Sequence, residues 1–139
     1  MHMKVYARAL ATVALALPCL AVQAGESAWT QAKTSAGISR GGHDINVAYT
    51  PTAGSVPLDA RIIRVHATRS YQGAAPVQTR LCWNGVAQCV PITGNSLTTH
   101  AFDGLDASKP FYLVHRVPGN TALTPPLFVK GEVAIWFTQ

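Results

Sequence analysis

Two cysteines, Cys82 and Cys89, are the residues of this chain whose type and spacing most directly suggest chemistry. They lie in the segment 80–92, whose pattern predicts two strands joined by a tight turn, with one cysteine on each strand. In an oxidising compartment such a pair forms a disulfide, whereas in the cytosol it suggests a metal or redox site. Redox chemistry usually uses a Cys-x-x-Cys motif at a helix N-terminus, and this segment has neither feature. The compartment decides between these interpretations.

The first 24 residues have the three parts of a cleavable secretory signal peptide. Lys4 and Arg8 supply a positive start, the run 9–17 is almost entirely small and apolar, and the segment 21–24 offers small residues for cleavage. The apolar run is too short to span a bilayer, which needs about 20 residues, so a membrane anchor is the weaker alternative. We therefore expect residues 1–24 to be removed and the product to be exported, with the bacterial periplasm as its location.

Export favours the structural interpretation of the cysteine pair. A two-residue turn that begins at Gly85 places Cys82 opposite Cys89, whereas a turn that begins at Asn84 places Cys82 opposite Ala87. Facing cysteines on neighbouring strands meet the Cα separation that a disulfide requires. The pairing therefore predicts a disulfide across a turn that starts at Gly85, or across a wider loop.

The charge balance excludes one class of partner and suggests another. The chain has 11 Lys and Arg against 6 Asp and Glu, and loss of the signal lowers the formal net charge from +5 to +3. The basic residues form no run or stripe of the kind that binds nucleic acid, so no nucleic-acid partner is expected. The densest basic region contains Arg61, Arg64, Arg69 and Arg80. It predicts either a solvated strand face that discourages edge pairing or a docking patch for an acidic partner.

The other titratable and nucleophilic residues show no catalytic arrangement, so we expect no enzyme, no cofactor and no metal. A hydrolase using His100 with Ser96 or Thr99 is the enzymatic alternative, but Ser96 lacks a Gly-x-Ser-x-Gly elbow. The histidines form no His-x-x-x-His pair. His66 shares a polar strand face and is expected at the surface. His115 lies on the apolar parity of its strand, which indicates a buried histidine that donates to a carbonyl.

The elements that position these residues are predicted to be strands. Apolar and polar residues alternate in the segments 44–50, 63–68, 111–117 and 133–138. Ile63, Val65 and Ala67 are expected to face the core together. Gly, Pro and Asn clusters separate the strands at short intervals, and no segment shows a helical period. The pattern predicts a single-domain antiparallel β-sandwich over residues 25–139, with a small barrel as the main alternative.

Four blocks of the sequence resemble the flagellar FlhE family. They are Gly25 to Trp29, Arg80 to Val90 with both cysteines, Gly94-x-Ser96-x-Thr98-Thr99-His100-x-Phe102, and Val114 to Gly119. The blocks occur in the family's order and span nearly the whole expected mature chain. The Thr-Thr-His-x-Phe block and the close cysteine pair are the most specific parts. The longer 33–42 region and the turn at 83–84 depart from the family pattern.

The resemblance implies a periplasmic β-sandwich protein of flagellum assembly that is encoded beside two components of the type III export gate. It implies that the protein binds export-gate or basal-body proteins in a chaperone-like or plug-like role that limits proton leakage. The candidate contact residues are Thr98, Thr99, His100 and Phe102, with Arg61, Arg64 and Arg80 as a second set.

A carbohydrate-binding module of the cell wall is the alternative from a different functional class. Such modules stack sugars on exposed aromatic rings, and this chain offers Trp29, Trp83 and Trp136. Trp136 has the opposite parity to Ile135 and Phe137, so we expect it to be exposed. Trp29 is expected to pack against the core.

Overall fold

The structure is a computed structural model that describes residues 12–16 and 25–139. Residues 1–11 and 17–24, and with them most of the expected signal peptide and its cleavage site, lie outside the described residues. In the described part of the chain, every element of regular secondary structure is a strand, and no helix there is long and apolar enough to cross a membrane. The strands are β1 (Ser27–Thr34), β2 (Ile38–Arg40), β3 (Asp44–Tyr49), β4 (Arg61–Tyr71), β5 (Gln78–Trp83), β6 (Gln88–Ile92), β7 (Ser96–Thr99), β8 (Phe111–Arg116), β9 (Ala122–Leu127) and β10 (Val129–Thr138).

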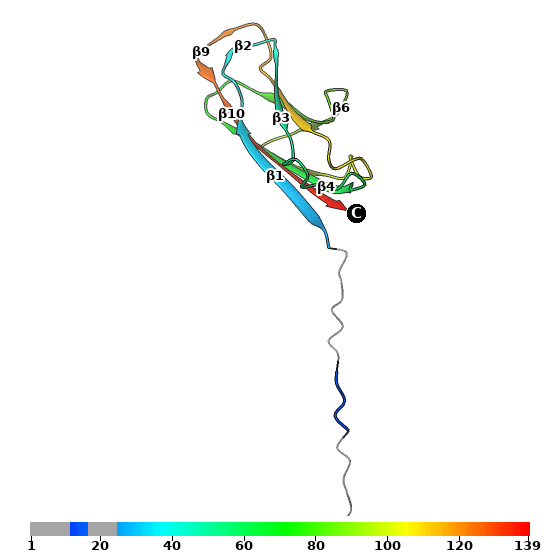
Figure 1. Cartoon of the computed structure of the whole chain (residues 1–139). Coiled ribbons are helices and arrows are strands. Elements are labelled where there is room, and N and C mark those ends of the chain that lie inside the picture. Colours follow the sequence, from blue (N-terminus) through cyan, green and yellow to red (C-terminus); the bar gives the residue numbers. More distant parts are fainter. Residues whose placement is uncertain (1–11, 17–24) are drawn as a thin grey trace, which may run out of the picture.

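The strands form two four-stranded sheets and one two-stranded sheet, all antiparallel. The first four-stranded sheet has the order β1-β10-β4-β7, and we call it the long sheet. The second has the order β3-β8-β5-β6, and we call it the hairpin sheet. The β2–β9 pair lies at the end of the domain opposite the C-terminus (Figure 1). The predicted antiparallel β-sandwich is confirmed.

The two large sheets enclose the main core. Its aromatic centre is Phe111 on β8, whose ring lies 5.3 Å from Phe102 in an edge-on arrangement and 6.4 Å from Trp29. Full burial of each such ring stabilises the fold by about 1.5–3 kcal/mol. Gly131 on β10 lies where the sheets approach closely, because the side chains of Tyr49 and Leu113 occupy the space that a Cβ atom there would need.

A β-bulge changes the alternation at the start of β4. Trp136 on β10 lies opposite Arg64, but the next residue, Phe137, lies opposite Ile62. As a result Ile62 is buried, whereas Ile63 is only partly buried. The prediction that Ile63 faces the core is therefore wrong, because an extra residue on one strand inverts the alternation beyond it.

Candidate functional site

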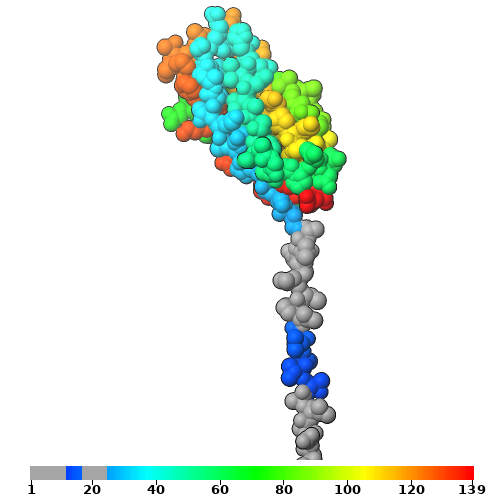
Figure 2. All heavy atoms as spheres, in the orientation of Figure 1, coloured from blue at the N-terminus to red at the C-terminus, as the bar shows by residue number. Residues whose placement is uncertain are grey.

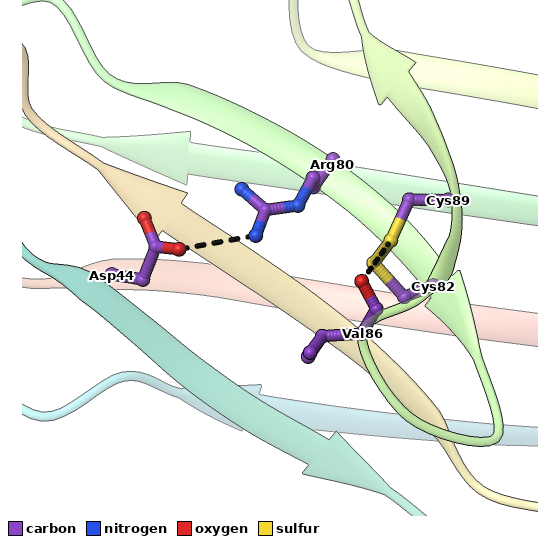
Figure 3. The surroundings of a disulfide bond; sticks show 5 residues. All are labelled: Asp44, Arg80, Cys82, Val86 and Cys89. Atoms are coloured by element: carbon purple, nitrogen blue, oxygen red, sulfur yellow. Dashed lines mark hydrogen bonds and ion pairs between the residues drawn. A yellow bond between two sulfur atoms is a disulfide. The ribbon is translucent and has the colours of Figure 1, made fainter.

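The predicted disulfide joins β5 to β6. Cys82 lies opposite Cys89, with a Cα separation of 4.1 Å and a bond between the two sulfurs (Figure 3). The sulfur of Cys89 also lies 3.2 Å from the Val86 carbonyl oxygen. Because an oxidised sulfur carries no proton, this is a close contact across the loop rather than a hydrogen bond. The pairing predicted from the cysteine positions is confirmed.

The connection between the two strands is the wider of the predicted alternatives. The ladder ends at the Trp83–Gln88 pair, so four residues form the loop. Asn84 and Gly85 both have positive φ, 51° and 123°. The N–H of Asn84 donates to the Pro110 carbonyl at 2.7 Å instead of pairing across the loop. This bond ties the hairpin loop to the segment before β8, whereas the disulfide ties β5 to β6 within the hairpin.

The Thr-Thr-His block lies on β7 and the turn after it. Thr98 Oγ1 lies 2.8 Å from Nδ1 of His66 on β4, and Thr99 Oγ1 accepts a hydrogen bond from the N–H of Ala101. The His100 side chain is 66% exposed. Its Nδ1 lies 2.9 Å from the Ile63 carbonyl oxygen and 3.0 Å from Asp103 Oδ2. Because a carbonyl oxygen can only accept, the hydrogen bond to Ile63 requires this nitrogen to be the donor.

Phe102 is excluded from the contact surface expected for this block. Its side chain is 1% exposed and packs in the main core against Phe111. The turn over residues 100–105 directs this ring inward while His100 stays outside. The block therefore has exposed polar side chains at one end and a buried aromatic ring at the other. In the sequence, only the apolar character of Phe102 indicated that its side chain would be buried.

The second set of candidate residues does not form one patch. Arg61 and Arg64 lie on β4 of the long sheet, whereas Arg80 lies on β5 of the hairpin sheet. The Arg64 guanidinium lies over the Trp136 ring, 4.4 Å from its centroid, and 3.7 Å from Glu26. The patch inferred from sequence proximity is therefore divided between two faces of the sandwich.

Arg80 belongs instead to a charge cluster on the hairpin sheet. Its NH2 group lies 3.1 Å from Asp44 Oδ2, and NH1 of Arg116 lies 3.2 Å from Asp44 Oδ1 (Figure 3 shows the Arg80–Asp44 pair). The hydrogen bond from Arg80 has the largest effect and lowers the pKa of Asp44; burial opposes it, and the hydrogen bond from Arg116 and the charges of both arginines lower this pKa further. Sequence reasoning missed Asp44 and Arg116 because they are adjacent only through strand pairing.

A row of hydrogen-bonded polar side chains, partly buried at Arg69 and fully buried at His115, connects the two sheets near this cluster. Arg69 on β4 donates from Nε to the Gly94 carbonyl at 2.8 Å and from NH1 to Thr79 Oγ1 at 2.8 Å and to the Val77 carbonyl. Thr79 Oγ1 in turn shares a hydrogen bond of 2.8 Å with Nδ1 of His115. The row runs from the surface of the long sheet to the interior of the hairpin sheet.

His115 at the end of this row is fully buried, as predicted, but its partner is a threonine hydroxyl and not a carbonyl. Its Nε2 has no hydrogen-bond partner among residues 12–16 and 25–139. Burial, and then the charge of Arg69, lowers the pKa of His115 to about 4. The imidazole is therefore neutral at physiological pH.

Comparison with known proteins places these features in a family. The family model described as "Flagellar protein FlhE" matches residues 38–137. The chain belongs to the FlhE family. It is 31% identical over 123 residues to "Flagellar protein FlhE" of Escherichia coli (strain K12), and this match covers 87% of this chain and 92% of the relative. The corresponding protein of Salmonella typhimurium (strain LT2) is 30% identical, with 88% and 94% covered.

A solved structure agrees with this assignment. The structure described as "Crystal Structure of FLHE" superposes with a TM-score of 0.67 at 27% identity, and the match covers 83% of this chain and 99% of that chain. The FlhE match includes the cysteine hairpin and the Thr-Thr-His-x-Phe block, the two segments on which the resemblance mainly rested.

The tryptophans of this FlhE-family chain do not form an open stacking platform. Trp29 is 8% exposed and donates from Nε1 to the Ala107 carbonyl, so its predicted packing is confirmed. Trp83 is partly buried and donates to the Asp106 carbonyl. Trp136 is partly buried beneath the Arg64 guanidinium. Residues 12–16 and 25–139 also contain no group of three or more His, Cys, Asp or Glu side chains placed to hold a metal ion.

Proposed function

We propose that this chain is a non-enzymatic accessory protein of bacterial flagellum assembly that acts by binding. The observation that carries the proposal is the FlhE family match over residues 38–137. The Thr-Thr-His block supports binding, because Thr98 and His100 present polar side chains at the surface.

The proposed location is the periplasm, reached through the signal peptide at residues 1–24. The Cys82–Cys89 disulfide supports this location, because such bonds form and persist in oxidising compartments. The proposed partners are export-gate or basal-body proteins of the flagellum. A chaperone-like or plug-like action that limits proton leakage is the role that we propose for the bound state.

The proposed contact surface is the outer edge of the long sheet at β7. β7 is the last strand of that sheet and pairs with β4 on one side. Thr98 and His100 are exposed, and Thr99 is partly exposed. An edge strand with free backbone groups and exposed polar side chains offers a partner both main-chain and side-chain hydrogen bonds.

In-cell crosslinking tests this proposal. A photo-reactive amino acid at Thr98 is expected to capture a basal-body or export-apparatus protein, identified by mass spectrometry. The matched control carries the same group at Leu58, which is 86% exposed but far from β7 in sequence. Capture of no flagellar component from Thr98, together with normal motility and proton homeostasis in a deletion strain, would overturn the proposal.

A further inference from the structure

A pocket of about 490 Å³ opens beside the stapled hairpin, and arginines dominate its polar lining. Arg69 comes from β4, Arg80 from β5 and Arg116 from the end of β8, so the pocket joins both sheets. Gln78 and Thr93 add neutral polar groups. Figure 2 shows part of the hairpin sheet at the surface along one flank of the domain, where the light-green atoms of the hairpin lie beside yellow atoms from later in the sequence.

The positive charge of this pocket exceeds the negative charge that faces it. Asp44 is the carboxylate paired with Arg80 and Arg116, and it uses one oxygen for each. Arg69 is held by two carbonyls and a threonine hydroxyl and has no carboxylate within 4.0 Å in the described part of the chain. Each guanidinium has five N–H donors, so most donors of Arg80 and Arg116 stay available to a ligand.

The walls of the pocket are held in place before any ligand binds. Three hydrogen bonds fix the Arg69 side chain, and the disulfide fixes β5 against β6, the two strands that carry Arg80 and the opposite wall at Pro91 and Ile92. Arg80 lies two residues from Cys82 on the same strand (Figure 3). A site that is already ordered loses less conformational entropy when a ligand binds.

We propose that this pocket binds the carboxylate of an acidic peptide. The pairing of Asp44 shows that the Arg80 and Arg116 guanidiniums already converge on a carboxylate supplied by the chain itself. Planar guanidinium forks match the two oxygens of a carboxylate, and such charge-assisted hydrogen bonds are stronger than neutral ones. A ligand carboxylate competes with Asp44 for these forks or joins it through their free donors.

Titration calorimetry on the disulfide-bonded chain tests this site with three probes. They are hexaglutamate with an amidated C-terminus, a neutral hexapeptide with a free C-terminal carboxylate, and inorganic phosphate. Binding of hexaglutamate that is tighter than binding of the other two probes supports the proposal. No hexaglutamate binding, or binding of the neutral peptide or of phosphate that is at least as tight, overturns it.

Variants of the cluster give effects of opposite sign. Arg80→Gln and Arg116→Gln are each expected to weaken peptide binding about tenfold or more, because each removes charge-assisted hydrogen bonds. Asp44→Asn is expected to strengthen it, because the internal competitor loses its charge. Arg61→Gln and Arg64→Gln are the matched controls, since they remove the same charge from the long sheet.

The same variants show how the proposal fails. An equal loss of binding in the two control variants reveals non-specific attraction and overturns the site, as does weaker binding in Asp44→Asn. Thermal melting of each variant checks that the fold is intact. Because the assay uses purified components, its failure leaves the proposed flagellar role standing, and loss of that role leaves the site standing.

Discussion

The two four-stranded sheets share one core but differ in what holds them together. The long sheet contains strands of 11, 10 and 8 residues in β4, β10 and β1. The strands of the hairpin sheet have 5 or 6 residues. The disulfide, the buried histidine and the Asp44 charge cluster all belong to the hairpin sheet.

This difference teaches where each kind of interaction is needed. A long antiparallel ladder supplies many backbone hydrogen bonds and cross-strand side-chain pairs. Short strands supply fewer, so a covalent link and a fixed row of polar side chains contribute a larger share of their order. We therefore expect the long sheet to depend on its ladder and the hairpin sheet to depend on its specific links.

The largest expected effect comes from breaking the ladder of the long sheet. Deleting residues 133–139 removes most of the positions at which β10 pairs with both β1 and β4. We expect no soluble folded protein, because two strands lose their partner and several core side chains are lost with it. The soluble yield and the thermal transition measure this. A truncated chain with a native-like melting transition would contradict the prediction, whereas deleting Gln139 alone, outside every strand, is the control.

Protonation of His115 tests the interior of the hairpin sheet. Its pKa is lowered from 6.5 to about 4 in the folded state, so the unfolded chain binds more protons between these values. Stability is therefore fully present above pH 6.5 and falls by about 3 kcal/mol as the pH drops to about 4.

Urea unfolding at several pH values measures this slope, and His115→Gln is expected to flatten it. Because the pKa values of Asp44 and Asp106 are lowered from 3.8, their stabilising contribution is present above pH 3.8 and is lost mainly as the pH falls below it, so it changes little within this window. A wild-type protein whose stability is constant from pH 6.5 to 4 would show that His115 does not behave as a buried neutral group.

Removing the disulfide tests the covalent link of the short strands. The bond joins residues seven positions apart, and closure of so short a loop stabilises a protein by about 2–3 kcal/mol in the chain-entropy model. The Cys82→Ala/Cys89→Ala double variant is expected to lose this amount in urea unfolding, and chemical reduction of the wild type should lose a similar amount. A loss below about 0.5 kcal/mol would show that the hairpin is ordered without its link.

The smallest expected effect concerns the exposed ion pair of the long sheet. Arg64 and Glu26 lie 3.7 Å apart with side chains 37% and 55% exposed. Exposed pairs of this kind contribute about 0–1 kcal/mol. A double-mutant cycle with Arg64→Ala and Glu26→Ala should give a coupling energy in that range. A coupling as large as the effect of the disulfide would remove the contrast drawn between the sheets.

Much of the fold follows from local patterns in the sequence. Alternating residues predicted the strands at 44–50, 111–117 and 133–138, and the structure has strands at these places. The cysteine positions predicted the register of the hairpin, because the side-chain period of two leaves few pairings that bring both sulfurs together. The bulge that turns Ile63 away from the core had no such local signal.

The candidate site was less predictable because its residues meet through pairing between distant strands. Arg80 was expected to act with Arg61 and Arg64, which belong to the same basic region of the sequence, but it pairs with Asp44, which also pairs with Arg116. Phe102 was expected at the surface with His100, but the turn between them directs the ring into the core.

By itself, the sequence determined the strand character of the chain, the disulfide and the membership of the FlhE family, because these depend on residue type and spacing along the chain. Tertiary structure alone decided which charges face one another and where the sheets approach. The packing of the two sheets explains why β10 has a glycine at position 131, since the side chains of Tyr49 and Leu113 from the other sheet fill the space that a Cβ atom would need. Such contacts depend on the order of strands in the sheets, and no local pattern encodes that order.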